Sequence, residues 1–248
     1  MNEIKTFKDE LIQRLEEKFK NSKRPIKAHI AFKKFKTWNA FWNKVISIDP
    51  SNPNIQALVF SVKIIILCGI LESLLRKKDA ESSKELFEQA MNFLDDEEKF
   101  LFCQQVFVLN KFNLNISDVN KRILNFYLRE ETNNFQQEFK RIVNYFYGLR
   151  SELVHQGGWG ITITYGPIFL FLLGKGKKKK GGKRRELKLN ERYISLEEIF
   201  LRILAKYSKI DIDDLSLKNK VKKFILEQGY ATKNKKHFEL FKKKFDLT

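Results

Sequence analysis

The chain of 248 residues carries 48 Lys and Arg against 30 Asp and Glu, which gives a formal net charge of +18. Its hydrophobic fraction of 43% and charged fraction of 31% exclude a disordered or fibrous protein. A chain of this length can form one large domain or two small ones.

The cysteine content and the lengths of the apolar runs exclude further classes of protein. Cys68 and Cys103 each stand alone in apolar surroundings, so the sequence offers neither a disulfide framework nor a paired-cysteine metal site. Uninterrupted apolar runs such as 64–68 are far shorter than the roughly 20 residues of a membrane span. The first five residues lack the apolar segment of a signal peptide. We therefore expect a basic, globular, cytoplasmic protein with no membrane segment.

Glycine and proline divide the chain into a long helical part and a short interruption. Nine of the eleven glycines lie between Gly148 and Gly182, and none of the four prolines lies between residues 54 and 166. A long stretch without these residues and without strand alternation is typical of helices joined by short polar turns. The expected helices in this part comprise residues 3–21, 28–46, 54–78, 83–94, 97–110, 117–130 and 133–155.

The helix expected at 54–78 is the central one. Between residues 57 and 75 only five side chains fall outside the apolar class, and a helix that is apolar on nearly all sides is buried. The preceding turn at 49–53 contains two prolines, and residues 51–54 offer N-cap side chains. The helix expected at 133–155 has an apolar stripe on one face, made by Phe135, Phe139, Ile142, Phe146, Leu149 and Leu153.

After Gly157-Gly158 the pattern changes from helix to strand. Residues 161–165 alternate between apolar and polar side chains, which predicts a strand that Pro167 limits. Segments 168–173 and 186–190 could form a hairpin across a basic Gly/Lys loop. The fold class is therefore mainly α, with a small β-hairpin insertion. Further helices are expected at 195–208, 216–228 and 234–246.

The positive charge is concentrated in two segments. Residues 175–185 contain eight Lys and Arg and no acid, and residues 216–248 contain ten Lys and three acids. Such a local excess suggests a polyanion as partner. The alternative is a solvated loop and tail in a chain that favours Lys over Arg throughout. The candidate polyanion-binding residues of the loop are Lys175, Lys177, Lys178, Lys179, Lys180, Lys183, Arg184 and Arg185.

The residues that could carry chemistry lie at the end of the helix at 133–155. Arg150 falls beside Tyr147 on a flank of the apolar stripe. A guanidinium in such surroundings must pair or bind a ligand, because an unpaired buried charge is too costly. Glu72, the lone acid on the central helix, is the expected structural partner of Arg150 or of another cation. His155 lies in the last turn, four residues after Ser151, where the helix dipole favours its protonated form. A histidine in this place is more often a cap than a catalyst.

The string YGLRSELVHQG at 147–157 resembles the Arg-x4-His signature of HEPN domains, and most closely that of the Apea-like branch. Residues 70–75 (ILESLL) and 200–207 (FLRILAKY) resemble the early and closing helices of the same family, so that the resemblance covers about residues 55–208. We therefore expect a HEPN-like helical domain at 54–208 with a basic hairpin at about 159–190. An N-terminal helical extension at 1–53 and basic C-terminal helices at 209–248 lie outside the resemblance.

The resemblance implies a helical bundle that forms a homodimer and a metal-independent endoribonuclease without a cofactor, acting in a toxin or antiviral defence system. Arg150 and His155 would be catalytic, with Ser151 where many members carry Asn or Asp, and with Glu72 and Tyr147 in support. RNA is the expected substrate, and its fragments should end in a 2′,3′-cyclic phosphate and a 5′-OH. An inhibitor or a defence-complex partner is also possible within this family.

Helix geometry favours a dimeric site. Arg150 and His155 point about 140° apart on an ideal helix, so one helix does not readily bring both to one phosphate. Two-fold pairing of the helix would bring residues from both subunits to one groove. Two alternatives remain: a non-catalytic HEPN protein that binds RNA or acts as a scaffold in a defence complex, and a DNA-binding regulator that uses the basic C-terminal helices.

Overall fold

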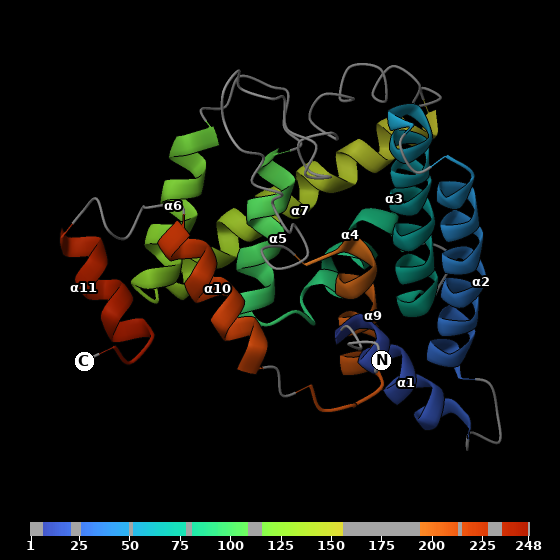
Figure 1. The fold of residues 1–248 in the computed structure, drawn as a ribbon, viewed down its shortest axis with the longest axis horizontal. Helices are drawn as coiled ribbons and strands as arrows, with labels where there is room; N and C mark the ends of the chain where they lie inside the picture. The colour runs from blue at the N-terminus through green and yellow to red at the C-terminus, as the bar shows by residue number, and fades with distance from the viewer. Residues whose placement is uncertain are drawn as a thin grey trace. The chain divides into compact units, whose positions relative to one another are not determined.

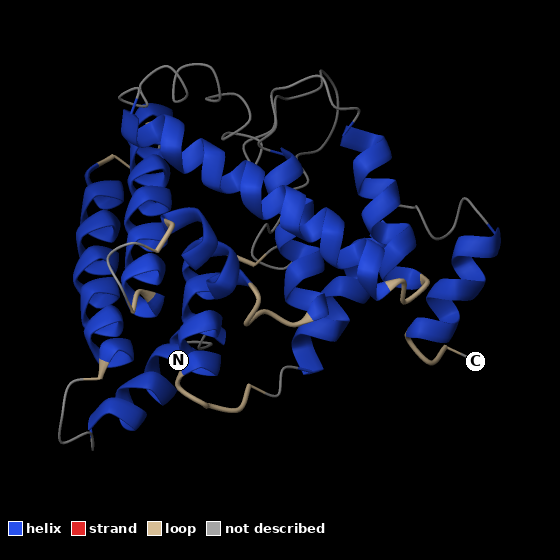
Figure 2. Ribbon diagram, turned by 180° about the vertical axis from the view of Figure 1, so that it is seen from behind, coloured by secondary structure: helices blue, strands red, loops and turns tan. Residues whose placement is uncertain are grey.

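In the computed structural model, every element of regular secondary structure in the described ranges is an α-helix (Figures 1 and 2). The prediction of a mainly α fold is therefore confirmed. The predicted strand at 161–165, the hairpin and the basic loop at 175–185 lie outside these ranges. The structure describes residues 7–20, 26–49, 52–77, 81–108, 116–155, 194–212, 215–227 and 235–247.

The helices lie where the sequence predicts them, with ends that differ by a few residues at most. Their bounds in the described ranges are α1 Phe7–Lys20, α2 Lys27–Ile48, α3 Pro53–Leu75, α4 Ser83–Met91, α5 Asp96–Val108, α6 Ile116–Leu128, α7 Thr132–His155, α9 Leu196–Tyr207, α10 Leu215–Glu227 and α11 Lys235–Lys244.

These helices form two compact units. Unit 1 contains α1 to α4, residues 147–155 of α7, and α9. Unit 2 contains α5, α6, residues 132–146 of α7, α10 and α11. This grouping follows contacts between helices, so the domain boundaries predicted at residues 53 and 208 stay predictions.

Unit 1 is built around α3 and α9. Helix α2 packs along α3, and α9 contacts α1, α2 and α3. The ring of Phe35 on α2 stacks on that of Phe200 on α9, with centroids 5.0 Å apart. Trp42, also on α2, is fully buried and meets the edge of Phe35. The core of unit 1 thus joins residues that lie far apart in the sequence.

Helix α3 begins as the sequence predicts. Pro53 occupies its first position, where a missing N–H costs nothing. The side-chain oxygen of Asn52 accepts a hydrogen bond from the backbone N–H of Ile55 at 3.3 Å, which caps the first turn. This local chemistry fixes the start of the helix immediately after the proline-containing turn.

Within the described ranges, α3 is the one helix long and apolar enough to cross a membrane by length and composition. The stretch Leu58–Leu75 has a mean hydropathy of 2.3, although half of it is buried inside the protein. It also carries Lys63, which forms an ion pair with Glu197 of α9. A buried, internally paired helix of this kind is typical of a protein core, and we interpret α3 in that way.

Helix α9 brings a charged pair into the core of unit 1. The side chain of Arg202 is 1% exposed, and its Nη2 and Nε donate to Oε1 of Glu198 at 2.7 and 3.1 Å. The guanidinium also lies 4.3 Å from the ring centroid of Phe7 on α1. Because Ser195 caps the backbone N–H of Glu198, the acid is held at the start of the helix, one turn before the arginine.

The end of α9 contains a residue in a strained backbone conformation. Lys209 has φ of 56°, and the N–H of Ile210 donates to the carbonyl of Ala205 at 2.9 Å, which closes a Schellman motif. A glycine is the residue best suited to this position. Lys209→Gly should therefore raise the free energy of unfolding by about 0.5–1 kcal/mol, measured by urea denaturation. Lys206→Gly, inside the same helix, should lower it by about 1 kcal/mol; equal effects from both would contradict the argument.

Unit 2 has an aromatic core of its own. Helix α5 packs against α6 and α10, and α11 packs against α6. The ring of Phe100 on α5 stacks on Tyr127 of α6, with centroids 4.7 Å apart, and meets Phe224 of α10 edge-on at 5.9 Å. Helices α10 and α11 bury apolar side chains such as Val221 and Phe241. Most of the basic residues on these helices are therefore left on the outer faces.

Candidate functional site at the end of helix α7

Helix α7 places Arg150 against the acid expected to be its partner. Nη2 of Arg150 lies 3.4 Å from Oε1 and 3.5 Å from Oε2 of Glu72 on α3. The side chains are 19% and 8% exposed, respectively. Both residues belong to unit 1. The structure thus shows the ion pair that the isolated acid of the central helix predicts.

This ion pair leaves part of the guanidinium unused. The two N–O distances are longer than the 2.7–2.9 Å of a tight charge-assisted hydrogen bond. Nε of Arg150 is buried without a hydrogen-bond partner among the described residues. A guanidinium has five N–H donors in a planar fork, and Glu72 engages only Nη2. Among the described residues, Arg150 is therefore held in place with its Nε donor unsatisfied, as expected of a residue that receives an anionic ligand.

Tyr147 covers one side of the guanidinium. Its ring centroid lies 5.3 Å from Cζ of Arg150, and 5.7 Å from the ring of Phe87 on α4. Burial raises the pKa of the Tyr147 phenol and Glu72 raises it further, while Arg150 lowers it. The phenol is therefore neutral near pH 7, and its role beside Arg150 is to orient the side chain rather than to carry charge.

Cys68 lies one turn before Glu72 on α3 and is a free, buried thiol. Burial raises its pKa far above the usual value, and the carboxylate of Glu72 adds to the effect. A thiol in this state is not a nucleophile. Cys68 therefore belongs to the packing of the site and not to its chemistry.

His155, at the end of α7, is exposed, whereas Ser151 one turn earlier is half-buried. No described residue forms a hydrogen bond or an ion pair with the imidazole of His155. The adjacent Val154 is 44% exposed. An exposed apolar side chain beside an exposed histidine leaves this end of the helix open to a partner or a substrate.

The structure therefore brings together Arg150, Glu72 and Tyr147 and places the exposed His155 at the end of the helix. The eight Lys and Arg at 175–185 lie outside the described residues. Among the residues that the structure does describe, no group of three or more His, Cys, Asp and Glu side chains could hold a metal ion.

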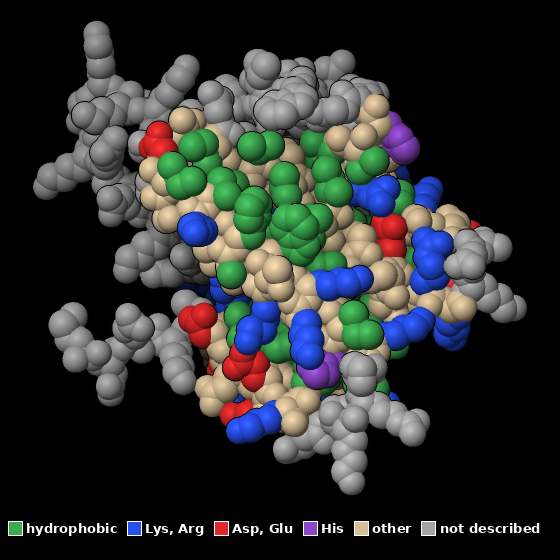
Figure 3. All heavy atoms as spheres, turned by 90° about the vertical axis from the view of Figure 1, so that its right-hand side faces the viewer, with side chains coloured by type: hydrophobic (Ala, Val, Ile, Leu, Met, Phe, Trp, Pro, Cys, Tyr) green, Lys and Arg blue, Asp and Glu red, His purple; other side chains and the backbone are tan. Residues whose placement is uncertain are grey.

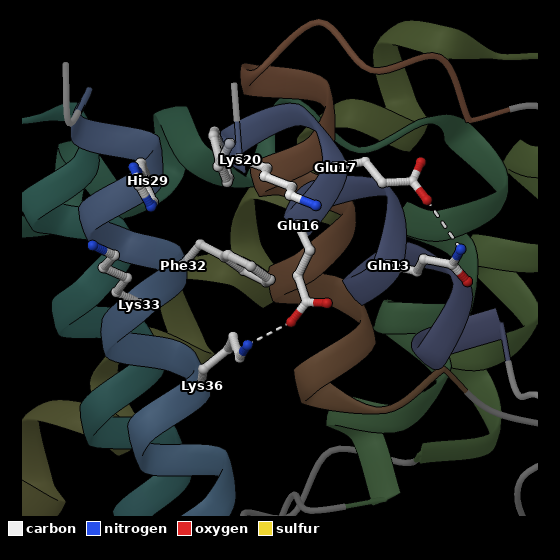
Figure 4. Close-up of a pocket in the computed structure, with 9 residues that line it drawn as sticks. Gln13, Glu16, Glu17, Lys20, His29, Phe32, Lys33 and Lys36 are labelled. Carbon is white, nitrogen blue, oxygen red and sulfur yellow. Dashed lines mark hydrogen bonds and ion pairs between the residues drawn. The ribbon is translucent and has the colours of Figure 1, made fainter. Parts of the chain in front are cut away.

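A second feature of unit 1 was missed by the sequence analysis. An open groove of about 570 Å³ lies between α1 and α2 (Figure 4). Its lining includes Lys20, Lys33 and His29, beside the aromatic rings of Phe19 and Phe32. The signal that could have found it is the segment 18–36, which carries eight Lys and Arg and no acid.

An apolar surface also lies on unit 1. On α2, Ile30, Phe41 and Ile48 are exposed at spacings of 11 and 7 residues, which puts them on one face of the helix. The edge of Trp38 meets the ring of Phe41 at 5.5 Å. Figure 3 shows hydrophobic side chains gathered on the side where α2 lies. A surface of this kind is typical of a contact with another macromolecule.

Comparison of the chain with models of protein families, with curated proteins and with solved structures finds no match in any of the three.

Proposed function

We propose that this protein is a metal-independent endoribonuclease of the HEPN type, which cleaves RNA in the cytoplasm as part of a toxin or antiviral defence system. One observation supports the proposal most directly: Arg150 is held beside Glu72 and Tyr147 with unused N–H donors, one turn and a half before an exposed His155. The spacing of these two residues is that of the Arg-x4-His signature.

The proposed reaction suits these two side chains. The 2′-OH of the ribose attacks the adjacent phosphorus, its proton passes to a base, and the 5′-oxygen leaves with a proton from an acid. Histidine is the side chain most often used for such proton transfers, and His155 would carry them out. Arg150 would stabilise the charge that develops on the phosphoryl oxygens, and the Ser151 hydroxyl would hydrogen-bond the phosphate or orient the imidazole.

We further propose that the site is completed in a homodimer. The angle of about 140° between Arg150 and His155 on α7 separates their side chains on one helix. Two copies of α7 that meet near their C-terminal ends would supply two histidines, one for each proton transfer. The exposure of Val154 beside His155 supports contact at this end.

The basic loop at 175–185 completes the proposal for RNA binding. Its eight Lys and Arg, from Lys175 to Arg185, are interspersed with glycines, and the segment contains no acid. Such a segment suits contact with the phosphate backbone irrespective of base sequence.

A non-catalytic HEPN protein that binds RNA or acts as a scaffold is the second candidate. The observation in its favour is that Arg150 already has an acidic partner in Glu72. If that ion pair is the whole role of Arg150, the residue stabilises the helix packing of unit 1, and His155 is a surface residue.

Incubation of the chain with mixed single-stranded RNAs in EDTA separates these candidates. A ribonuclease of the proposed type should produce fragments that end in a 2′,3′-cyclic phosphate and a 5′-OH, as identified by end-group analysis. Tight binding of intact RNA would favour the scaffold. Binding of duplex DNA with no cleavage of RNA would favour a regulator that acts through α10 and α11.

A further inference from the structure

The groove between α1 and α2 has the composition of a binding site for a polyanion. The described residues on either side of it, 18–20 and 26–36, carry six Lys and no acid. Lys20 comes from the last position of α1, and Lys33 from the second turn of α2 (Figure 4). The groove therefore receives positive charge from both of its walls.

Two of these lysines are available to a ligand. Glu16 forms an ion pair with Lys36 across the groove, and this acid is thereby neutralised. Lys20 and Lys33 are exposed and pair with no acid among the residues described. Glu17 accepts a hydrogen bond from Gln13 at 3.0 Å and lies with it on the α1 side, away from Lys33 (Figure 4). The unneutralised charge on the α2 side of the groove is therefore positive.

Aromatic rings line the groove beside these lysines. The ring of His29 is parallel to that of Phe19, with centroids 5.2 Å apart and planes 10° from each other. Phe32 meets Phe19 at 5.7 Å. His29 is half-buried, and its Nδ1 is buried without a hydrogen-bond partner among the described residues.

We propose that this groove binds a segment of single-stranded RNA. Lys20 and Lys33 contact successive phosphates, and the imidazole of His29 provides a ring for an unpaired base. Lysines next to aromatic rings in an open groove are the elements of single-strand binding, whereas a duplex hides the faces of its bases. The inference rests on the proposed function, since it names a place where the RNA substrate is held apart from Arg150 and His155.

The test is equilibrium binding of a single-stranded RNA to the full-length chain in the His155→Ala background, which keeps the RNA intact. Lys20→Gln combined with Lys33→Gln should weaken binding on the order of tenfold or more at 0.1 M salt. It should also reduce the slope of log K against log[salt] by about 1.4, because two phosphate contacts are lost. The matched control is Lys34→Gln with Lys44→Gln, which removes the same charge from exposed positions of α2 outside the groove.

A substitution that removes a negative charge from the groove should have the opposite effect on RNA binding. Glu17 is hydrogen-bonded to the neutral Gln13, so its negative charge would repel RNA. Glu17→Gln removes this charge and should strengthen RNA binding severalfold. Equal affinities for the groove variant and the control pair would overturn the groove assignment. The proposed function would then stand if the wild-type chain still cleaves RNA in EDTA. If the wild-type chain does not cleave RNA and the groove variant still lowers RNA affinity, the proposed function is wrong and the assignment of the groove stands.

His29 tests the contact with a base. His29→Ala should weaken binding of ordinary RNA by about five- to a hundredfold, the range for loss of one stacked base, and His29→Phe should retain most of the affinity. Neither substitution should change the binding of an abasic strand of the same length. A loss with His29→Ala that is equal on both strands would show that the ring acts only by packing on Phe19, and would overturn its role in stacking.

Discussion

His155→Ala is expected to abolish RNA cleavage in EDTA and to leave the stability of the chain unchanged. The imidazole is exposed, and surface substitutions away from structural contacts usually alter the free energy of unfolding by less than about 0.5 kcal/mol. Loss of a residue that transfers protons lowers a rate by about 10²–10⁴-fold. The rate of cleavage should therefore fall by at least two orders of magnitude with an unchanged urea midpoint.

Arg150 requires a different variant, because its side chain is part of the packing. Arg150→Ala would leave the carboxylate of Glu72 buried without this cation, at a cost of about 3 kcal/mol. Arg150→Lys keeps the positive charge but loses the planar fork, so it should retain most of the stability and little of the activity. Full activity in Arg150→Lys or in His155→Ala would contradict the proposed roles.

Glu72→Gln tests whether Glu72 holds Arg150 in position or takes part in the reaction itself. The amide keeps the shape of the side chain but removes the charge that holds Arg150. We expect a chain that is less stable and a cleavage rate that falls less than in His155→Ala. Unchanged stability and activity would remove Glu72 from the site.

The largest effect on stability is expected from Arg202→Ala. The guanidinium is almost fully buried, and its loss would leave Glu198 without this charged partner in the core of unit 1. Removing one member of a buried ion pair destabilises a protein by about 3–5 kcal/mol. Urea denaturation followed by circular dichroism should show a correspondingly lower midpoint, or a chain that is not folded.

The matched control is Arg14→Ala, on α1 of the same unit. Arg14 also pairs with a glutamate one helical turn away, Glu10, but both side chains are more than two-fifths exposed. Exposed pairs of this kind contribute about 0–1 kcal/mol. Replacing both Arg202 and Glu198, by Met and Leu, should recover part of the stability lost in Arg202→Ala. Similar losses at Arg14 and Arg202 would show that burial does not determine the effect.

The local pattern of the sequence was sufficient to predict the helices and one contact of the site. The apolar stripe on α7 and the proline–asparagine start of α3 depend on neighbours within a few residues, so they can be read directly. The pairing of Glu72 with Arg150 was also predictable, because an acid on a nearly apolar helix needs a cation. The conformation of the basic loop is untested, as it lies outside the described residues.

What the sequence did not reveal depends on contacts between distant segments. Arg202 has the spacing of an ordinary exposed residue of an amphipathic helix, and only the packing of α9 on α1 shows that it is buried. The groove formed by Lys20, Lys33 and His29 likewise requires α1 and α2 to lie side by side. Its charge was visible in the sequence, whereas its hollow shape and the Phe19–His29 stack were not.

Unit 1 is formed by segments of the chain that are synthesised at different times. Arg150 and His155 leave the ribosome before α9, yet the core of unit 1 needs Phe200 of α9 against Phe35 of α2. A nascent chain that ends after α7 therefore has both residues of the proposed site without the scaffold that aligns them. Activity of the proposed site toward the messenger or the ribosome that is making the protein would then be avoided until α9 has been synthesised.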